Sequence, residues 1–140
     1  MRVLFDTNVI LDVLLEREPF VNDALYLLAK VERAEITGFI CATTVTTIYY
    51  LVNKALGKKE ADRHIKTLLS VFEIAPVNRA VLEEALNLEF SDTEDAVLYS
   101  SALTVGADCI VTKNRADFRK AKIPVYTPDE LVKVMKSIKG

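Results

Sequence analysis

The sequence predicts an α/β fold with three layers, in which helices cover both faces of a mainly parallel sheet of roughly five strands. Short apolar runs rich in β-branched residues alternate with helical stretches along the whole chain. The connections between them are short, and this alternation is typical of a parallel sheet. The 140 residues contain no linker, repeat or low-complexity stretch. We therefore expect a single domain spanning residues 1–140.

The first half of the chain alternates two strands with four helices. Pro19 separates the first two helices, and Gly57 is a suitable residue to end the third. The third helix is expected although it is rich in β-branched residues. The predicted strands are 2–5 and 37–42, and the predicted helices are 9–15, 22–33, 43–56 and 61–69.

The second half continues the alternation. Asn78 can cap a helix through Leu86, and the segment Thr127-Pro128-Asp129-Glu130 is a capping box that starts the last helix. The helix at 92–105 is apolar on nearly every side and should be well buried. Further strands are predicted at 71–75, 109–112 and 123–126, with a short helix or turn around Asp117.

Composition limits the functions that the chain can have. Apolar residues make up 51% and charged residues 27%, and the formal net charge is −2. Such a chain has no global attraction for nucleic acid, so contact with RNA requires a local basic patch. No leader-like segment and no apolar run of about 20 residues is present. We expect a soluble, cytoplasmic protein without a membrane partner. Cys41 and Cys109 are interpreted as buried thiols, with a disulfide left open.

Acidic and polar side chains follow the predicted strands at the ends where sites form in parallel sheets. One group follows the first strand, another follows the fourth, and a third opens the buried helix between them. Acids from distant parts of the sequence should therefore meet at one edge. The groups are Asp6-Thr7-Asn8, then Thr112 with Asn114 and Asp117, and then Asp92 with Glu94 and Asp95.

Clustered carboxylates repel one another and raise each other's pKa, which a hard divalent cation relieves. Mg²⁺ and Mn²⁺ prefer oxygen ligands. Such ions activate water and stabilise the transition state of phosphoryl displacement. The residues therefore predict metal-dependent hydrolysis of a phosphodiester.

The chain resembles the PIN-domain family over essentially its whole length. The residues that carry the resemblance are Asp6-Thr7-Asn8, Asp92-x-Glu94-Asp95-Ala96, and Ile110-Val111-Thr112-x-Asn114-x-x-Asp117-Phe118. The resemblance implies cleavage of single-stranded RNA with Mg²⁺ or Mn²⁺, a homodimer, and often the toxin role in a toxin–antitoxin pair.

The same resemblance implies roles for individual residues. Asp6, Asp95 and Asp117 match the acidic metal ligands of the family, and Asn114 matches a further catalytic position that is Asp or Asn there. Thr7, Asn8 and Thr112 match residues that support the acids, and Asp92 and Glu94 flank the central one.

One position departs from the family pattern. Thr47 lies about where PIN nucleases carry a second acid, early in the helix after the second strand. A hydroxyl cannot replace that negative charge. The alternative is therefore a degenerate PIN-like module that binds RNA or a partner without cutting. Asp92 or Glu94 could compensate for the missing acid.

Structural interpretations of the same residues remain open. Asp6 can cap the first helix, Ser91 with Glu94 can form a capping box, and Asp95 gains from the helix dipole. Arg115, Arg119 and Lys120 could hold a phosphate backbone, although basic runs are usually solvated. His64 is expected at the surface, and the Tyr-rich helix from Thr43 is a candidate dimer face. A response-regulator receiver is set aside, because its acidic pair and phosphoacceptor have no counterparts here.

Overall fold

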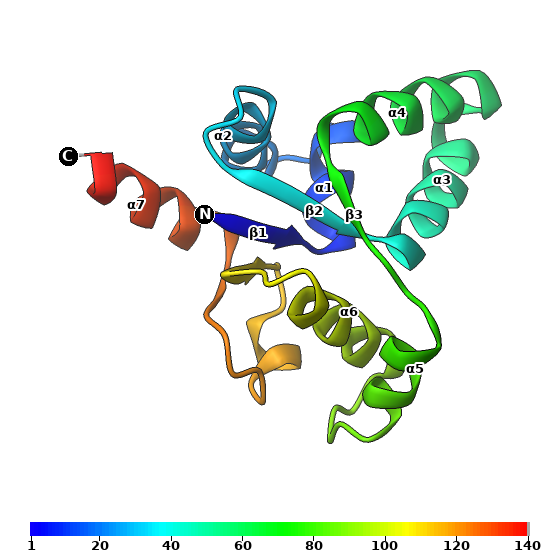
Figure 1. Ribbon diagram of the computed structural model, residues 1–140. Helices are drawn as coiled ribbons and strands as arrows, with labels where there is room; N and C mark the ends of the chain where they lie inside the picture. Colours follow the sequence, from blue (N-terminus) through cyan, green and yellow to red (C-terminus); the bar gives the residue numbers. More distant parts are fainter. Residues whose placement is uncertain (140) are drawn as a thin grey trace.

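Five parallel strands form one sheet at the centre of residues 1–139, the part of the chain that the computed structural model describes (Figure 1). The strand order is β3-β2-β1-β4-β5, and each neighbouring pair is parallel. The predicted strand count and direction are therefore confirmed. The strands are β1 (Arg2–Phe5), β2 (Thr37–Cys41), β3 (Glu73–Ala75), β4 (Cys109–Val111) and β5 (Val125–Tyr126).

Helices cover both faces of the sheet, as a three-layer fold requires (Figure 1). One face is covered by α1 (Thr7–Leu14), α2 (Val21–Glu32), α3 (Ala42–Leu56), α4 (Lys58–Val71) and α7 (Pro128–Lys139). The other is covered by α5 (Arg79–Leu86), α6 (Thr93–Thr104) and the 3₁₀ helix η1 (Arg115–Phe118).

Alternation along the strands fills the two hydrophobic layers. In β1, Val3 and Phe5 face the α1 side, whereas Leu4 faces the α6 side. Residues of β4 alternate in the same way, because successive side chains of a strand point to opposite faces. The seven residues of α6 from Ala96 to Ala102 are all buried, which confirms the prediction of a helix apolar on nearly every side.

Several element boundaries differ from the predicted ones. Helix α1 begins at Thr7, two residues early, because Asp6 caps it. Helix α4 begins directly after Gly57, whose positive φ of 93° ends α3 and turns the chain. Val71 ends α4 instead of starting a strand, so β3 is only three residues long.

Gly38 allows β2 to lie against its neighbours. A Cβ atom at this position would come within 2.7 Å of the Phe72 ring and 2.8 Å of a Val31 methyl group. A larger residue would force this layer apart.

The two cysteines are free and buried, as interpreted from the sequence. Burial raises the pKa of the Cys109 thiol to about 12, so this thiol is unreactive near neutral pH. Within residues 1–139, no helix combines the length and the apolar character needed to cross a bilayer.

The strand order places a topological switch point between β1 and β4. The chain moves outward from β1 through β2 to β3, then returns to β4 on the other side of β1. Ligands of open α/β sheets bind beyond the carboxyl ends of the strands at such a point. Asp6 follows β1 there, and Thr112 follows β4.

Candidate functional site

Asp6 is fixed at the carboxyl end of β1 by hydrogen bonds on both carboxylate oxygens. Its Oδ1 accepts from the backbone N–H of Thr7 at 2.7 Å, which caps α1. Its Oδ2 accepts from the hydroxyl of Thr112 at 2.7 Å, and Thr112 is fully buried. The Asp6 backbone also donates to Val111, at 3.0 Å. Asp6 therefore both caps a helix and presents a carboxylate of defined orientation to the switch point.

Asp95 lies in the first turn of α6, where Asp92 provides the cap. The Asp92 carboxylate accepts from the backbone N–H of Asp95 at 3.1 Å. The expected capping box of Ser91 and Glu94 is wrong, because the helix begins one residue later and Asp92 takes the capping position. Glu94 is thereby left exposed to line the site.

These carboxylates share one electrostatic environment. Burial, together with the negative charges of Asp92, Asp6, Asp117 and Glu94, raises the pKa of Asp95 to about 7, and burial is the largest cause. Burial also raises the pKa of Asp6, against the hydrogen bonds from Thr112 and Thr7, and Asp117 adds to the rise. The structure therefore brings Asp6 and Asp117 close enough to Asp95 to oppose its ionisation.

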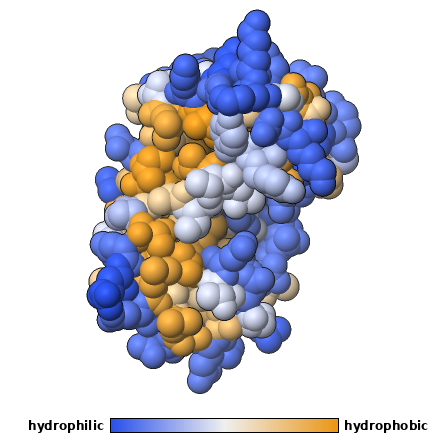
Figure 2. Space-filling model, turned by 90° about the vertical axis from the view of Figure 1, so that its right-hand side faces the viewer, coloured by the Kyte–Doolittle hydropathy of each residue, from blue (hydrophilic) through white to orange (hydrophobic). Residues whose placement is uncertain are grey.

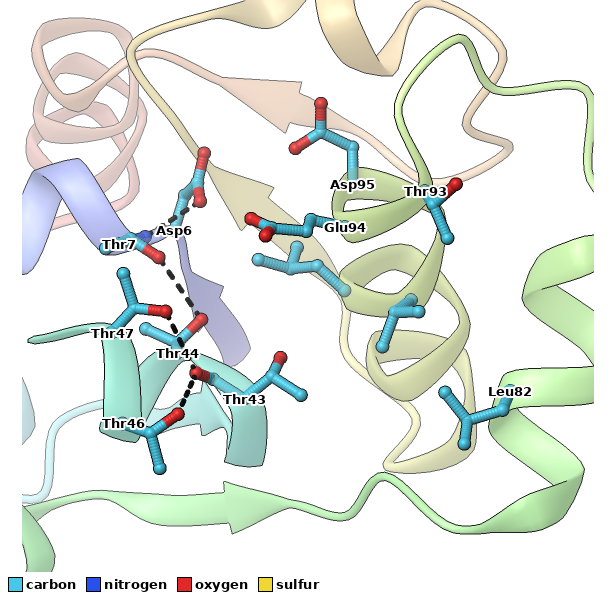
Figure 3. A pocket seen from close by; sticks show the side chains of 12 residues that line it. Asp6, Thr7, Thr43, Thr44, Thr46, Thr47, Leu82, Thr93, Glu94 and Asp95 are labelled. Atoms are coloured by element: carbon cyan, nitrogen blue, oxygen red, sulfur yellow. Dashed lines mark hydrogen bonds between the residues drawn. The ribbon is translucent and has the colours of Figure 1, made fainter.

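A hollow of about 320 Å³ opens in front of Asp6 and Asp95, here called the acidic pocket (Figure 3). The side chain of Glu94 points across it toward Asp6, and threonines of α3 form the facing wall. Its lining comprises Asp6, Thr7, Thr43, Thr44, Thr46, Thr47, Leu82, Thr93, Glu94, Asp95, Val97 and Leu98.

Thr47 lies on this threonine wall and not in the packed core. It is exposed, and its hydroxyl donates to the backbone carbonyl of Thr43 at 3.3 Å. Thr46 donates to the same carbonyl at 2.9 Å, and Thr7 donates to Thr44 at 3.3 Å. The wall is therefore uncharged at the position where the family pattern has an acid.

The turn after β4, residues 112–117, carries the remaining candidates. The backbone N–H of Asn114 donates to the Thr112 hydroxyl at 3.1 Å, and that of Asp117 donates to the Asn114 carbonyl at 3.0 Å. Both side chains are exposed. Asp117 lines a second hollow, next to Arg119 and Lys120. Asn8 is exposed on α1 and lies outside the lining of the acidic pocket.

Two of the three candidate RNA-binding residues are engaged in ion pairs. Arg115 pairs with Glu130 at 2.9 Å, and Lys120 pairs with Glu89 at 3.2 Å. Arg119 makes no ion pair with any residue of the described chain, 1–139, and it lines the hollow that Asp117 also lines. Of the three, Arg119 therefore has a side chain without an ion-pair partner among the described residues.

The threonine wall is the feature that sequence reasoning missed. The threonines at positions 43, 44, 46 and 47 follow β2 at the same edge of the sheet as Asp6. Their position directly after a strand is the sequence signal that could have identified the wall. Leu82 of α5 had no such signal, because only the packing of α5 on α6 brings it to the pocket.

The donor chemistry fits a hard divalent cation. The acidic pocket offers carboxylate and hydroxyl oxygens, and the raised pKa of Asp95 marks a charge repulsion that a cation would relieve. In residues 1–139, no three acidic, histidine or cysteine side chains are arranged to hold one ion together. Mg²⁺ commonly uses one or two carboxylates and keeps several waters, which such an arrangement allows.

A three-layer α/β fold with an acidic pocket at its switch point is what a metal-binding hydrolase requires, so the chain is a candidate for that class. The family comparison is more specific, since the model of the PIN domain matches residues 2–116. The chain belongs to the PIN domain family.

Individual relatives agree with this assignment. The chain is 28% identical over 134 residues to Ribonuclease VapC1 of Aquifex aeolicus, and the alignment covers 92% of each protein. The fold is similar to a DNA-bound VapBC structure from Salmonella typhimurium, with a TM-score of 0.69 and 14% identity over 91% of this chain and 98% of that one. The fold is also similar to a toxin–antitoxin complex from Klebsiella pneumoniae, with a TM-score of 0.68 and 24% identity over 90% of this chain and 97% of that one. At these identities, the structures support the fold alone.

Proposed function

We propose that the chain is a metal-dependent endoribonuclease that cleaves single-stranded RNA at the acidic pocket. The observation that carries this proposal is the position of Asp6, Asp95 and Asp117 around the switch point of a PIN domain, where Asp6 and Asp117 help to raise the pKa of Asp95 and Asp117 helps to raise that of Asp6. The similarity to a protein named ribonuclease supports RNA as the substrate. We assign the whole chain to one PIN domain, because β5 and α7 complete the sheet and its cover beyond residue 116.

Asp6 and Asp95 would hold Mg²⁺ or Mn²⁺, and Asp117 would add negative charge from the edge of the turn. A bound cation would lower the pKa of a coordinated water and polarise the scissile phosphate. The Thr112 hydroxyl keeps Asp6 oriented, and Asn114 borders the same turn. Arg119 would hold a neighbouring phosphate, a role supported by its position in the hollow of Asp117 and by the lack of an ion-pair partner among the described residues.

The experiment is cleavage of a labelled, unstructured RNA with Mn²⁺ or Mg²⁺. We expect cutting that disappears with a chelator and in Asp6→Asn. Asp129→Asn is the matched control, because Asp129 is an exposed aspartate at the start of α7 that bonds to nearby Thr127 and lies outside the lining of the acidic pocket. Cutting that survives in Asp6→Asn would contradict the proposal.

A second function is favoured by the neutral threonine wall. If Thr47 leaves the pocket too weakly charged for catalysis, the chain is a PIN-like module that binds RNA or a partner. The cleavage assay distinguishes the two, because a folded protein that binds RNA and Mn²⁺ without cutting would support the module.

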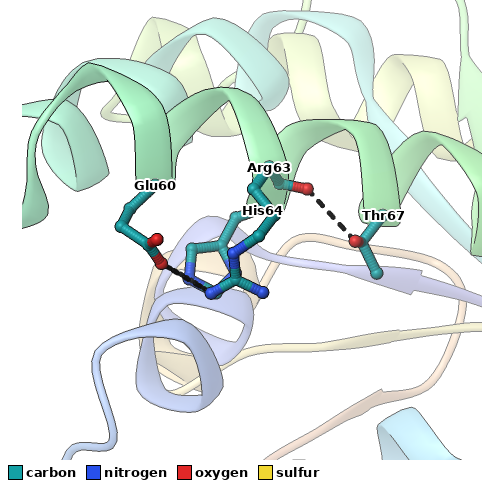
Figure 4. Close-up of polar contacts among 4 residues, drawn as sticks. All are labelled: Glu60, Arg63, His64 and Thr67. Carbon is teal, nitrogen blue, oxygen red and sulfur yellow. Dashed lines mark hydrogen bonds and ion pairs between the residues drawn. The ribbon is translucent and has the colours of Figure 1, made fainter.

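We also propose a protein partner of the antitoxin kind. Solved neighbours of this fold include toxin–antitoxin complexes. The largest of the hollows described here, of about 680 Å³, lies between α1, α2, α3 and α4, where Leu25 and Leu56 are exposed. Its rim is charged: Glu60 pairs with Arg63 and lies 3.9 Å from His64 (Figure 4). A partner segment with apolar and charged side chains fits such a groove.

Co-expression with a candidate antitoxin protein tests the partner. We expect it to co-purify with the wild type and to be lost in Leu56→Glu. Retention in Leu56→Glu would move the partner to another surface.

A homodimer is proposed on the face that carries α3 and α5. Figure 2 shows an apolar band running down this side of the molecule. Ile74, Leu82 and Leu86 are exposed on β3 and α5, and Tyr50 is exposed on α3.

A cytoplasmic location is also proposed, since both buried thiols are free.

A further inference from the structure

Asp12 is a fully buried carboxylate that takes no part in the acidic pocket. It lies on α1, six residues after Asp6, with no exposed surface. Its charge is compensated by Lys113, whose Nζ donates to Oδ1 at 3.2 Å and lies 3.0 Å from Oδ2. Arg17 is more distant, at 3.8 Å, and is partly exposed. Lys113, which comes 101 residues later in the chain, is therefore the main partner of this charge.

Lys113 is itself held on a second side. Its ammonium group lies 3.7 Å from the centre of the Phe20 ring, and its side chain is only 22% exposed. Phe20 comes from the segment between α1 and α2. The aromatic face attracts the cation and shields the ion pair from water. Three separate segments thus meet at the lysine.

The position of Lys113 connects this ion pair to the acidic pocket. Its neighbour Thr112 donates to Asp6, and its other neighbour Asn114 donates from its backbone to the Thr112 hydroxyl. A shift of Lys113 would therefore move the group that orients Asp6 and the start of the turn that carries Asp117. These two hydrogen bonds restrict how far Lys113 can move without displacing Asp6 or the turn.

We propose that the Asp12–Lys113 pair, covered by Phe20, is a positioning device that fixes the 112–117 turn against Asp6. Buried ion pairs are weak sources of net stability, because desolvation offsets their attraction. They do favour one arrangement of the chain, which is what a site built from two distant segments requires. The functional part of the proposal rests on the proposed nuclease pocket, but the positioning itself does not.

Hydrogen exchange of the Asn114 and Asp117 amides tests the positioning without any activity assay. In Lys113→Met, we expect both amides to exchange roughly tenfold faster or more, while the amides of α6 keep the wild-type rate. Asp12→Asn should do the same if it folds, and Lys113→Arg should restore slow exchange, because Arg can pair with Asp12 and stack on Phe20. Lys58→Met is the control, since it removes an exposed ion pair on α4.

Calorimetry with Mn²⁺ then tests the link to the pocket. We expect Lys113→Met to weaken Mn²⁺ binding and to lower kcat more than KM, with Lys113→Arg close to the wild type. Unchanged exchange of both amides in Lys113→Met would overturn the proposal, even if the melting temperature falls. If the wild type does not cut RNA, the exchange result still decides whether the pair positions the turn.

Discussion

The Asp95 carboxyl group shows how burial and charge set the behaviour of single residues in the acidic pocket. Its pKa is raised from 3.8 to about 7, first by burial and then by Asp92, Asp6, Asp117 and Glu94. Ionisation of Asp95 therefore opposes folding. A cation bound beside it would reverse that effect, so pH and metal should act on the same group.

This shift predicts a pH dependence of stability. Between about pH 4 and about pH 7, folded metal-free protein retains a proton on Asp95 that the unfolded chain has released, so the Asp95 contribution to the free energy of unfolding falls as pH rises. Thermal unfolding in a chelator, at about pH 5 and about pH 8, should show Asp95→Asn gaining stability relative to the wild type at the higher pH. The same stability difference between Asp95→Asn and the wild type at both pH values would contradict a raised pKa of Asp95.

Thr47 allows the charge of the pocket to be increased. Because its side chain lines the acidic pocket with an uncharged hydroxyl, Thr47→Glu would add a carboxylate on the wall facing the acids. We expect tighter Mn²⁺ binding, with the stoichiometry rising from about one ion toward about two. Thr47→Val, which keeps the shape without the charge, should bind as the wild type does. Equal Mn²⁺ affinity in both variants would show that a charge on this wall does not affect metal binding.

At the scale of elements, Asp92 has two roles that substitutions can separate. It caps α6 and contributes negative charge to Asp95. Asp92→Asn keeps a capping oxygen, so the free energy of unfolding should change little, whereas Asp92→Ala should lose about 1 kcal/mol. Both should lower the pKa of Asp95. Chemical denaturation of the two variants is the measurement, and an equal loss in both would argue against capping by Asp92.

The elements also show where local sequence is insufficient. The buried helix α6 was predicted because its apolar residues have no polar face, and its burial agrees. Its start was misplaced, because Ser91 and Asp92 are both good capping residues and only the folded backbone selects Asp92. The early start of α4 was missed for a similar reason. Lys58 and Lys59 read as loop residues from sequence, but the turn at Gly57 leads directly into the helix.

For the whole molecule, the sheet topology explains what could be predicted of the candidate site. Asp6 and Thr112 follow strands directly, so strand prediction alone placed them at one edge of a parallel sheet. The Asp12–Lys113 pair could not be found in this way, because it joins residues 101 positions apart through the packing of α1. Leu82 also reaches the pocket only through helix packing.

The apolar face predicts the oligomeric state. Leu86 is 74% exposed on α5, on the side with the apolar band of Figure 2, and Ile138 is 69% exposed on α7. If the face with α3 and α5 forms the dimer, Leu86→Glu should yield a monomer in sedimentation velocity, while Ile138→Glu should stay dimeric. Dissociation by Ile138→Glu alone would place the interface on α7.

We propose that Asp6 and Asp95, from distant parts of the sequence, act together on one divalent cation. Titration of metal-free protein with Mn²⁺ by calorimetry, for the wild type, Asp6→Asn, Asp95→Asn and Asp129→Asn, tests it most directly. We expect saturable binding in the wild type and in Asp129→Asn, and loss of about tenfold or more in affinity in each of the other two. Wild-type affinity in either Asp6→Asn or Asp95→Asn would contradict a shared site.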